Sequence, residues 1–193
     1  MSVPTWRCAS RQRWEGVPNR GCIYRHNSQP VRKLASSDIV EGFDCGQTPL
    51  NQYLQRFALT NQKAGSAQTY VCCADGWVAG YYSLAVASVD PANAAPRVIK
   101  RIARHPVPVM ILARLAVALG HHNVGLGRAL LRDALPRPAQ ASDIAGIRAL
   151  LVHAKDETAR RWYLNWEFEA SVTDPFHLLL LLKDLKSILG LKS

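Results

Sequence analysis

The sequence predicts an α/β fold built on one mixed β-sheet with a parallel centre and helices on its flanks. A β-hairpin is followed by strand, helix, strand, helix, strand and strand, which is the order that builds such a sheet. The 193 residues fit one domain, and the 48% of apolar residues are enough for its core. Coiled coils, collagen-like chains and disordered chains are excluded, because none of them has this composition.

A strand and a helix open the predicted domain. The strand spans 31–35, and the helix follows with Thr48 as its N-cap and Pro49 in its first position. Four apolar residues at helical spacing share one face of this helix: Leu50, Leu54, Phe57 and Ala58. We expect that face to be buried.

A β-hairpin comes next. The runs 66–74 and 77–89 are rich in β-forming residues, and Asp75-Gly76 between them is a strong signal for a two-residue turn. After a basic connection, residues 107–119 are apolar almost throughout. That pattern is typical of a strand buried on both faces.

The second half of the chain alternates helices and strands. Gly125 and Gly127 mark a turn, and a helix follows over 126–135. Pro136 and Pro138 should stop or kink this helix near its end, since a proline inside a helix costs about 3 kcal/mol. The remaining predicted elements are a strand over 147–154, a helix over 156–165 and strands over 167–172 and 177–183.

The domain boundaries follow from this pattern. Residues 1–30 lack helical or alternating periodicity and are interpreted as a basic appendage, 31–185 form the domain, and 186–193 form a short tail. The apolar run 178–182 has five residues, which is too short to span a membrane. Because the first 30 residues also lack the apolar stretch of a secretory signal, we expect a cytoplasmic protein without membrane contacts.

The cysteines indicate a reducing compartment. Five cysteines are an odd number and contain no repeated CxxC pair, which argues against a disulfide framework. Cys8, Cys22 and His26 are spaced too irregularly for a typical zinc site, so we expect no metal.

Positive charge is concentrated in two segments of this chain, whose formal net charge is +10. Residues 1–34 hold seven basic residues against one acid. The segment 91–132 contains no Asp or Glu, and its seven basic residues are Arg97, Lys100, Arg101, Arg104, Arg114, Arg128 and Arg132. Such a block favours a polyanionic partner, either a polyphosphate or RNA, although a solvated face that aids solubility explains the charge about equally well.

The turn at Gly125-Leu126-Gly127 is the most informative local motif. Glycines at a helix start let backbone N–H groups approach a phosphate, and the helix dipole adds roughly half a positive charge. Alone, a GxG turn is a weak signal and is more often an ordinary turn. It lacks the lysine of a P-loop and does not follow the first strand, which disfavours both a P-loop and a Rossmann site.

The same turn matches a specific family motif. Gcn5-related N-acetyltransferases bind the pyrophosphate of acetyl-coenzyme A with Gln/Arg-x-x-Gly-x-Gly/Ala after their fourth strand, and residues 122–127 stand in that place. Over 31–185 the chain resembles the acetyltransferase toxins of toxin–antitoxin pairs. The matching segments include 43–46, 50–54, 80–85, 106–109, 112–117, 152–154 and 162–163.

The resemblance implies a function and its partners. It implies a toxin that acetylates the amino group of aminoacyl-tRNA and so halts translation, with acetyl-coenzyme A as cosubstrate. It also implies a ribbon-helix-helix antitoxin and a homodimer. Two other classes stay open: an acetyltransferase acting on a small amine or a protein N-terminus, and a non-catalytic module that binds RNA or an antitoxin.

The resemblance also implies site residues. Backbone groups of Leu115, Ala116 and Val117 are expected to hold the acetyl carbonyl and pantetheine. The pyrophosphate is expected at His122, Asn123, Val124, Gly125, Leu126, Gly127 and Arg128. The basic block supplies candidate tRNA contacts, namely Arg97, Lys100, Arg101, Arg104 and Arg114. His122, Asn123 and Val124 differ from the family pattern, which predicts weaker phosphate binding.

Tyr163 is the predicted proton donor. Attack of an amine on a thioester expels a thiolate, and a phenol with an ordinary pKa near 10 can protonate it. Without the resemblance, we would favour a tyrosine packed in the core beside Trp162 and Trp166.

The absence of an obvious base bears on the substrate. No acid lies between Asp90 and Asp133 to deprotonate a lysine, whose ordinary pKa is about 10.4. An α-amine titrates near 8, and an adjacent ester lowers its pKa further, so aminoacyl-tRNA presents an amine that is largely neutral at pH 7. His153 is a candidate weak base or water-orienting group, although a histidine at a strand end is more often a hydrogen-bonded structural residue.

Overall fold

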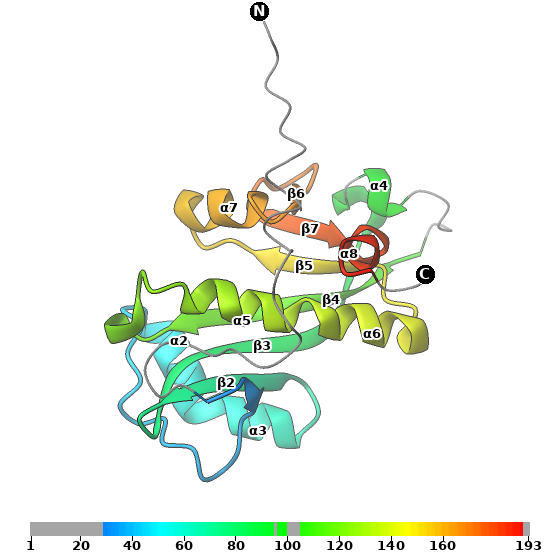
Figure 1. Cartoon of the computed structure of the whole chain (residues 1–193). Helices are drawn as coiled ribbons and strands as arrows, with labels where there is room; N and C mark the ends of the chain where they lie inside the picture. Colours follow the sequence, from blue (N-terminus) through cyan, green and yellow to red (C-terminus); the bar gives the residue numbers. More distant parts are fainter. Residues whose placement is uncertain (1–28, 95, 100–104, 191–193) are drawn as a thin grey trace, which may run out of the picture.

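The computed structural model describes residues 29–94, 96–99 and 105–190 (Figure 1). Seven strands form one sheet in the order β1-β2-β3-β4-β5-β7-β6. All neighbouring pairs are antiparallel except β4 and β5, which run parallel at the centre. The predicted fold class is therefore confirmed. The strands are β1 (Arg32–Lys33), β2 (Gln68–Ala74), β3 (Trp77–Val89), β4 (Val107–Val117), β5 (Ala149–His153), β6 (Glu169–Ala170) and β7 (His177–Leu181).

Helices cover both faces of the sheet. One face is covered by α5 (Leu126–Ala134), α6 (Pro136–Ala145), α7 (Glu157–Leu164) and α8 (Leu182–Ile188). The opposite face is covered at one end by α2 (Thr48–Gln52), η1 (Tyr53–Phe57) and α3 (Ala58–Lys63), and at the other end by α4 (Pro96–Ile99). Two short 3₁₀ turns are η2 (Pro91–Asn93) and η3 (Leu119–His121). Figure 1 shows α5 and α6 crossing in front of the sheet.

The hairpin of β2 and β3 forms where its turn was predicted. Asp75 and Gly76 both have positive φ, 51° and 85°, as a tight primed turn requires. Gly80 in β3 lets helix α5 approach the sheet closely, because a Cβ at this position would lie 2.9 Å from Leu130.

The first helical region differs from the prediction. Its N-cap is Gln47 and not Thr48, and η1 interrupts it as a π-helical turn in which the Ala58 N–H bonds the Tyr53 carbonyl. The wider turn rotates the residues that follow. Leu54 and Ala58 are buried, but Phe57 is 53% exposed, so its predicted burial was wrong.

The prolines after α5 end one helix, as predicted, and begin another that was not predicted. Helix α5 ends at Ala134, as the stop near Leu135 predicted, but Pro136 then begins α6, a second helix that we did not predict. Proline is compatible with the first turn of a helix, because the first N–H groups have no partner within the helix. The expected tail at 186–193 was also placed too early, because α8 continues through this boundary to Ile188.

A bulge divides strand β4. Ser83 of β3 pairs with Arg114, but the next residue, Leu84, pairs with Leu112. Ala113 is therefore an extra residue on β4, which bends the strand locally.

The central strands separate at this bulge. Parallel pairing of β4 with β5 begins at Val109 and Ala149 and ends at Leu112 and Val152. Beyond this last pair, β4 continues to Val117 without β5 beside it. The expected burial on both faces therefore fails for this half of β4, because several of its side chains are only half-buried. No helix in the described part of the chain is long and apolar enough to cross a membrane.

Candidate functional site

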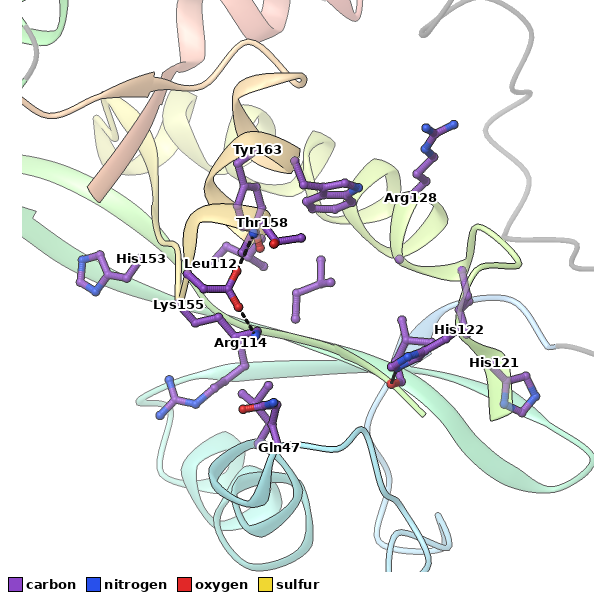
Figure 2. Close-up of a pocket in the computed structure, with 18 of the residues that line it drawn as sticks. Gln47, Leu112, Arg114, His121, His122, Arg128, His153, Lys155, Thr158 and Tyr163 are labelled. Atoms are coloured by element: carbon purple, nitrogen blue, oxygen red, sulfur yellow. Dashed lines mark hydrogen bonds and ion pairs between the residues drawn. The ribbon is translucent and has the colours of Figure 1, made fainter. Parts of the chain in front are cut away.

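A cavity of about 950 Å³ occupies the fork between β4 and β5 (Figure 2). Five regions line it: the end of β4, the turn before α5 with the start of that helix, the end of β5, the start of α7 and the start of α2. The lining residues are Gln47, Pro49, Leu50, Leu112, Ala113, Arg114, Leu115, Val117, His121, His122, Asn123, Gly125, Leu126, Gly127, Arg128, His153, Lys155, Asp156, Thr158, Ala159, Trp162 and Tyr163.

The turn before α5 has the backbone geometry that an anion site needs. Gly125 is the N-cap of α5 with φ 85°, and Asn123 is also left-handed with φ 60°. No acidic residue lies in the first turn of α5, so the positive end of the helix is not neutralised there. A Cβ at Gly127 would lie 3.8 Å from Val117, which is an ordinary contact. An alanine would therefore fit at this position, so the packing of the protein does not explain why the residue is a glycine.

Two histidines precede this turn. His122 Nε2 lies 2.7 Å from the Val117 carbonyl oxygen, within hydrogen-bonding distance. His121 Nδ1 is buried and has no hydrogen-bond partner in the described part of the chain. Both rings lie at the same end of the cavity as Arg128 (Figure 2).

Eight of the ten predicted donor-site residues line the cavity, and two do not. Ala116 is 5% exposed and packs against the α2 and η1 side of the sheet. Val124 is 48% exposed and is not part of the lining.

Tyr163 lies between the two ends of the cavity. Helix α7 begins at its N-cap Asp156, whose carboxylate accepts a hydrogen bond from the Ala159 N–H at 2.7 Å. This cap orients the helix that carries Tyr163. The Tyr163 ring packs edge-on against Trp162 and Phe168 and is only 9% exposed. Burial raises the pKa of Tyr163 well above its usual value, so the phenol stays protonated near neutral pH.

The other end of the cavity carries cationic and imidazole side chains. Arg114, His153 and Lys155 lie there, away from His122 and Arg128 (Figure 2). The Arg114 guanidinium sits 4.7 Å from the centre of the Tyr53 ring and donates to the Ala113 carbonyl at 2.8 Å. These contacts hold Arg114 at the bulge.

Several lining residues were not identified from the sequence. Lys155 and Gln47 belong to segments that are far apart in the chain, and only the fold brings them together. Lys155 directly follows the predicted strand 147–154. Ligands of α/β sheets often bind at the carboxyl ends of strands, so this position could have marked Lys155 as a candidate site residue.

The predicted tRNA contacts divide into three groups. Arg114 lines the cavity. Arg97 lies outside its lining and forms ion pairs with Glu169 and with Asp184. A phosphate at Arg97 would have to compete with these two carboxylates. Lys100, Arg101 and Arg104 lie outside the described residues, as do Cys8, Cys22 and His26.

Comparisons with known proteins agree with this geometry. No family model matches the chain. The chain is 45% identical over 159 residues to a tRNA-acetylating toxin of Mycobacterium tuberculosis, and the match covers 82% of this chain and 95% of the relative.

Two solved structures have similar folds. One is AtaT complexed with acetyl-methionyl-tRNAfMet, with a TM-score of 0.76, 24% identity and coverage of 84% of this chain and 99% of that chain. The other is a mutant of the AtaT toxin bound to acetyl-CoA and the C-terminus of the antitoxin AtaR, with a TM-score of 0.70, 22% identity and coverage of 85% and 99%. At these identities the structural likeness supports the fold alone. The match to the mycobacterial relative goes further, and the chain belongs to the family of tRNA-acetylating toxins.

Proposed function

We propose that this protein transfers the acetyl group of acetyl-coenzyme A to the α-amine of aminoacyl-tRNA and thereby blocks translation as a toxin. The cavity at the β4–β5 fork carries this proposal, because it has a glycine turn at a helix N-terminus at one end and cationic side chains at the other. A buried, protonated tyrosine lies between these ends. The mycobacterial tRNA-acetylating toxin supports the same activity.

The donor half of the cavity suits acetyl-coenzyme A. The first N–H groups of α5 have no partner within the helix and can bind a pyrophosphate, and Arg128 adds a positive charge to the cavity lining. The backbone of β4 from Leu115 to Val117 has no β5 partner on its fork side. Its peptide groups can therefore bind the amides of pantetheine and the acetyl carbonyl, as a strand added at a sheet edge would do.

Transfer requires one proton to reach the leaving sulfur. The amine attacks the thioester carbonyl, a C–N bond forms, and the oxyanion is stabilised by backbone N–H donors. The C–S bond then breaks, and Tyr163 donates its phenolic proton to the departing thiolate. The buried position of Tyr163 keeps bulk water from competing for this transfer.

The acceptor half suits the end of a tRNA. Arg114 and Lys155 place positive charge where the terminal phosphates of an aminoacyl-tRNA would enter. We further propose that Lys100, Arg101 and Arg104 contact other phosphates of the tRNA. Arg97 contributes less, because Glu169 and Asp184 already pair with it.

The proposal extends to regulation and location. AtaT was solved with the C-terminus of its antitoxin AtaR, which supports an antitoxin partner for this chain. We propose that this antitoxin is of the ribbon-helix-helix type, that the toxin is a homodimer, and that it acts in the cytoplasm, where aminoacyl-tRNA is found.

Cell-free translation tests the proposal. We expect the purified protein to stop synthesis only when acetyl-coenzyme A is present, and freshly charged tRNA to restore it. Inhibition that does not require acetyl-coenzyme A, or that persists after charged tRNA is added, would contradict the proposal.

A further inference from the structure

His153 occupies a position in the fork that neither the donor site nor the proton donor uses. It is the last residue of β5 and follows Val152, the last residue of β5 that pairs with β4. Its ring stacks on His177 of β7 with 4.0 Å between centroids and 20° between planes. His153 lines the cavity, whereas His177 does not. In the sheet β5 lies between β7 and β4, so His177 stacks on His153 from the β7 side, which is the side of β5 opposite to β4.

The charged neighbours of His153 do little to stabilise its protonated form, because they pair with other residues. Lys155 comes two residues after it and pairs with Asp156, and Asp174 pairs with His177 at 3.4 Å. Arg114 reaches the same end of the cavity from β4. Burial and the neighbouring His177 lower the pKa of His153, while Asp174 acts weakly in the opposite direction. A neutral imidazole with a free ring nitrogen can accept a proton.

We propose that His153 is the proton acceptor for the attacking amine, an inference that rests on the function proposed above. The neutral amine attacks the acetyl carbonyl and becomes a positively charged nitrogen with two hydrogens. One of these protons passes to a ring nitrogen of His153 as the C–N bond forms. The C–S bond then breaks, and the thiolate takes a proton from Tyr163. His153 later loses its proton to water, and Tyr163 regains one, so the products are the acetyl amide and free coenzyme A.

This assignment also bears on which amines react. A histidine with a lowered pKa is far too weak to deprotonate a lysine ammonium, whose ordinary pKa is about 10.4. It can assist only an amine that is already largely neutral, such as the α-amine of an aminoacyl ester, whose pKa lies below about 8. His153 therefore favours aminoacyl-tRNA over lysine side chains.

The pH dependence of single-turnover acetylation of aminoacyl-tRNA tests this role. In the wild type, both the amine and His153 must be neutral, so the logarithm of the rate should approach a slope of about 2 against pH in the acid range. In His153→Gln, which keeps a polar side chain but cannot accept the proton, the slope should fall to about 1. Its rate near neutral pH should fall by about 10²-fold, at the low end of general-base effects.

Two further variants separate this role from a structural one. His177→Gln removes the neighbour that lowers the pKa of His153, so the acid limb should move to higher pH. His105→Gln changes an exposed histidine that does not line the cavity, and its profile should match the wild type. If His153→Gln acetylates with the wild-type slope and rate, His153 is not the proton acceptor, although the proposed function stands. If the wild type acetylates no aminoacyl-tRNA, both proposals fail.

Discussion

Leu112 and Val152 form the last parallel pair between β4 and β5 and lie directly before the point where the two strands separate. The bulge at Ala113 follows Leu112 at once, and His153 follows Val152. One local irregularity thus opens the sheet and exposes the edge of β4. The cavity begins at this pair, and the turn before α5 and Tyr163 both line it.

Gly127 should affect donor binding more than folding. Gly127→Ala adds a methyl group that the protein accommodates, with 3.8 Å to Val117, but that takes up space at a cavity-lining residue where we expect the pyrophosphate. The melting temperature should hold or rise, because alanine is the better helix former by about 1 kcal/mol. Affinity for acetyl-coenzyme A should fall by about tenfold or more, since one charged hydrogen bond is worth about 1.5–3 kcal/mol.

Calorimetry on Gly127→Ala and on Gly120→Ala measures this effect. Gly120 is a matched control because a Cβ there meets open space and the residue does not line the cavity. Equal acetyl-coenzyme A affinities in the two variants would place the pyrophosphate elsewhere.

Tyr163→Phe should separate chemistry from stability. The phenylalanine keeps the ring contacts with Trp162 and Phe168, so thermal unfolding should change little. Acetyl transfer should fall by about 10²- to 10⁴-fold, the usual loss when a general acid is removed. Tyr70→Phe removes the hydroxyl of another buried tyrosine outside the cavity and should keep wild-type activity. A Tyr163→Phe variant with the wild-type rate would assign the proton donor to another group.

Arg114 and Arg97 should behave differently towards tRNA. Arg114→Gln should raise the KM for charged tRNA and flatten its salt dependence by a slope of about 0.7 to 0.9 per lost phosphate contact. Arg97→Gln should lower stability slightly, because its partners Glu169 and Asp184 are left unpaired, and should change the KM little. Binding titrations at several salt concentrations measure both effects. An equal loss of tRNA affinity in the two variants would place RNA on the α4 side as well.

Stability should decline above about pH 10. Burial raises the pKa of Tyr81, Tyr82 and Tyr163 in the folded protein well above their ordinary value near 10. The unfolded chain then loses protons that the folded protein keeps, so the free energy of unfolding falls as pH rises past about 10. Below that pH these groups contribute no pH dependence.

Denaturant unfolding between about pH 8 and about pH 11 checks this. Each buried tyrosine contributes a loss of about 1.4 kcal/mol per pH unit in the alkaline range. Tyr82→Phe should lower the alkaline slope by one such contribution. An unchanged slope in this variant would mean that Tyr82 ionises in the folded state as readily as in the unfolded chain.

Much of the fold follows from local chemistry. Asp75-Gly76 and Gly125 were recognisable because few other residues adopt the positive φ that these positions require. Glu167 also has a positive φ of 69°, a conformation that its residue type does not predict. The mixed sheet with a parallel centre followed from the alternation of strands and helices along the chain.

The features that open the site were not predictable in this way. The bulge at Ala113 adds one residue to a continuous apolar run, and nothing in that run marks the change of register. The π-helical turn that exposes Phe57 likewise has no signature in residue spacing. The stacking of His153 on His177 depends on two strands that are adjacent only in the folded sheet. The bulge and the histidine stacking depend on contacts between strands that are distant in the chain, and local sequence patterns do not reveal such contacts.

Mass spectrometry of the terminal aminoacyl-adenosine shows whether the protein acetylates the α-amine of aminoacyl-tRNA. Total charged tRNA is incubated with acetyl-coenzyme A and either the wild type or Tyr163→Phe, then digested with nuclease to release the terminal aminoacyl-adenosines. We predict that the wild type yields one or more aminoacyl-adenosines heavier by one acetyl group on the α-nitrogen, and that Tyr163→Phe yields far less. Wild-type products without this added group, or with the acetyl group on a lysine side chain or a ribose hydroxyl, would rule out α-amine acetylation by this protein.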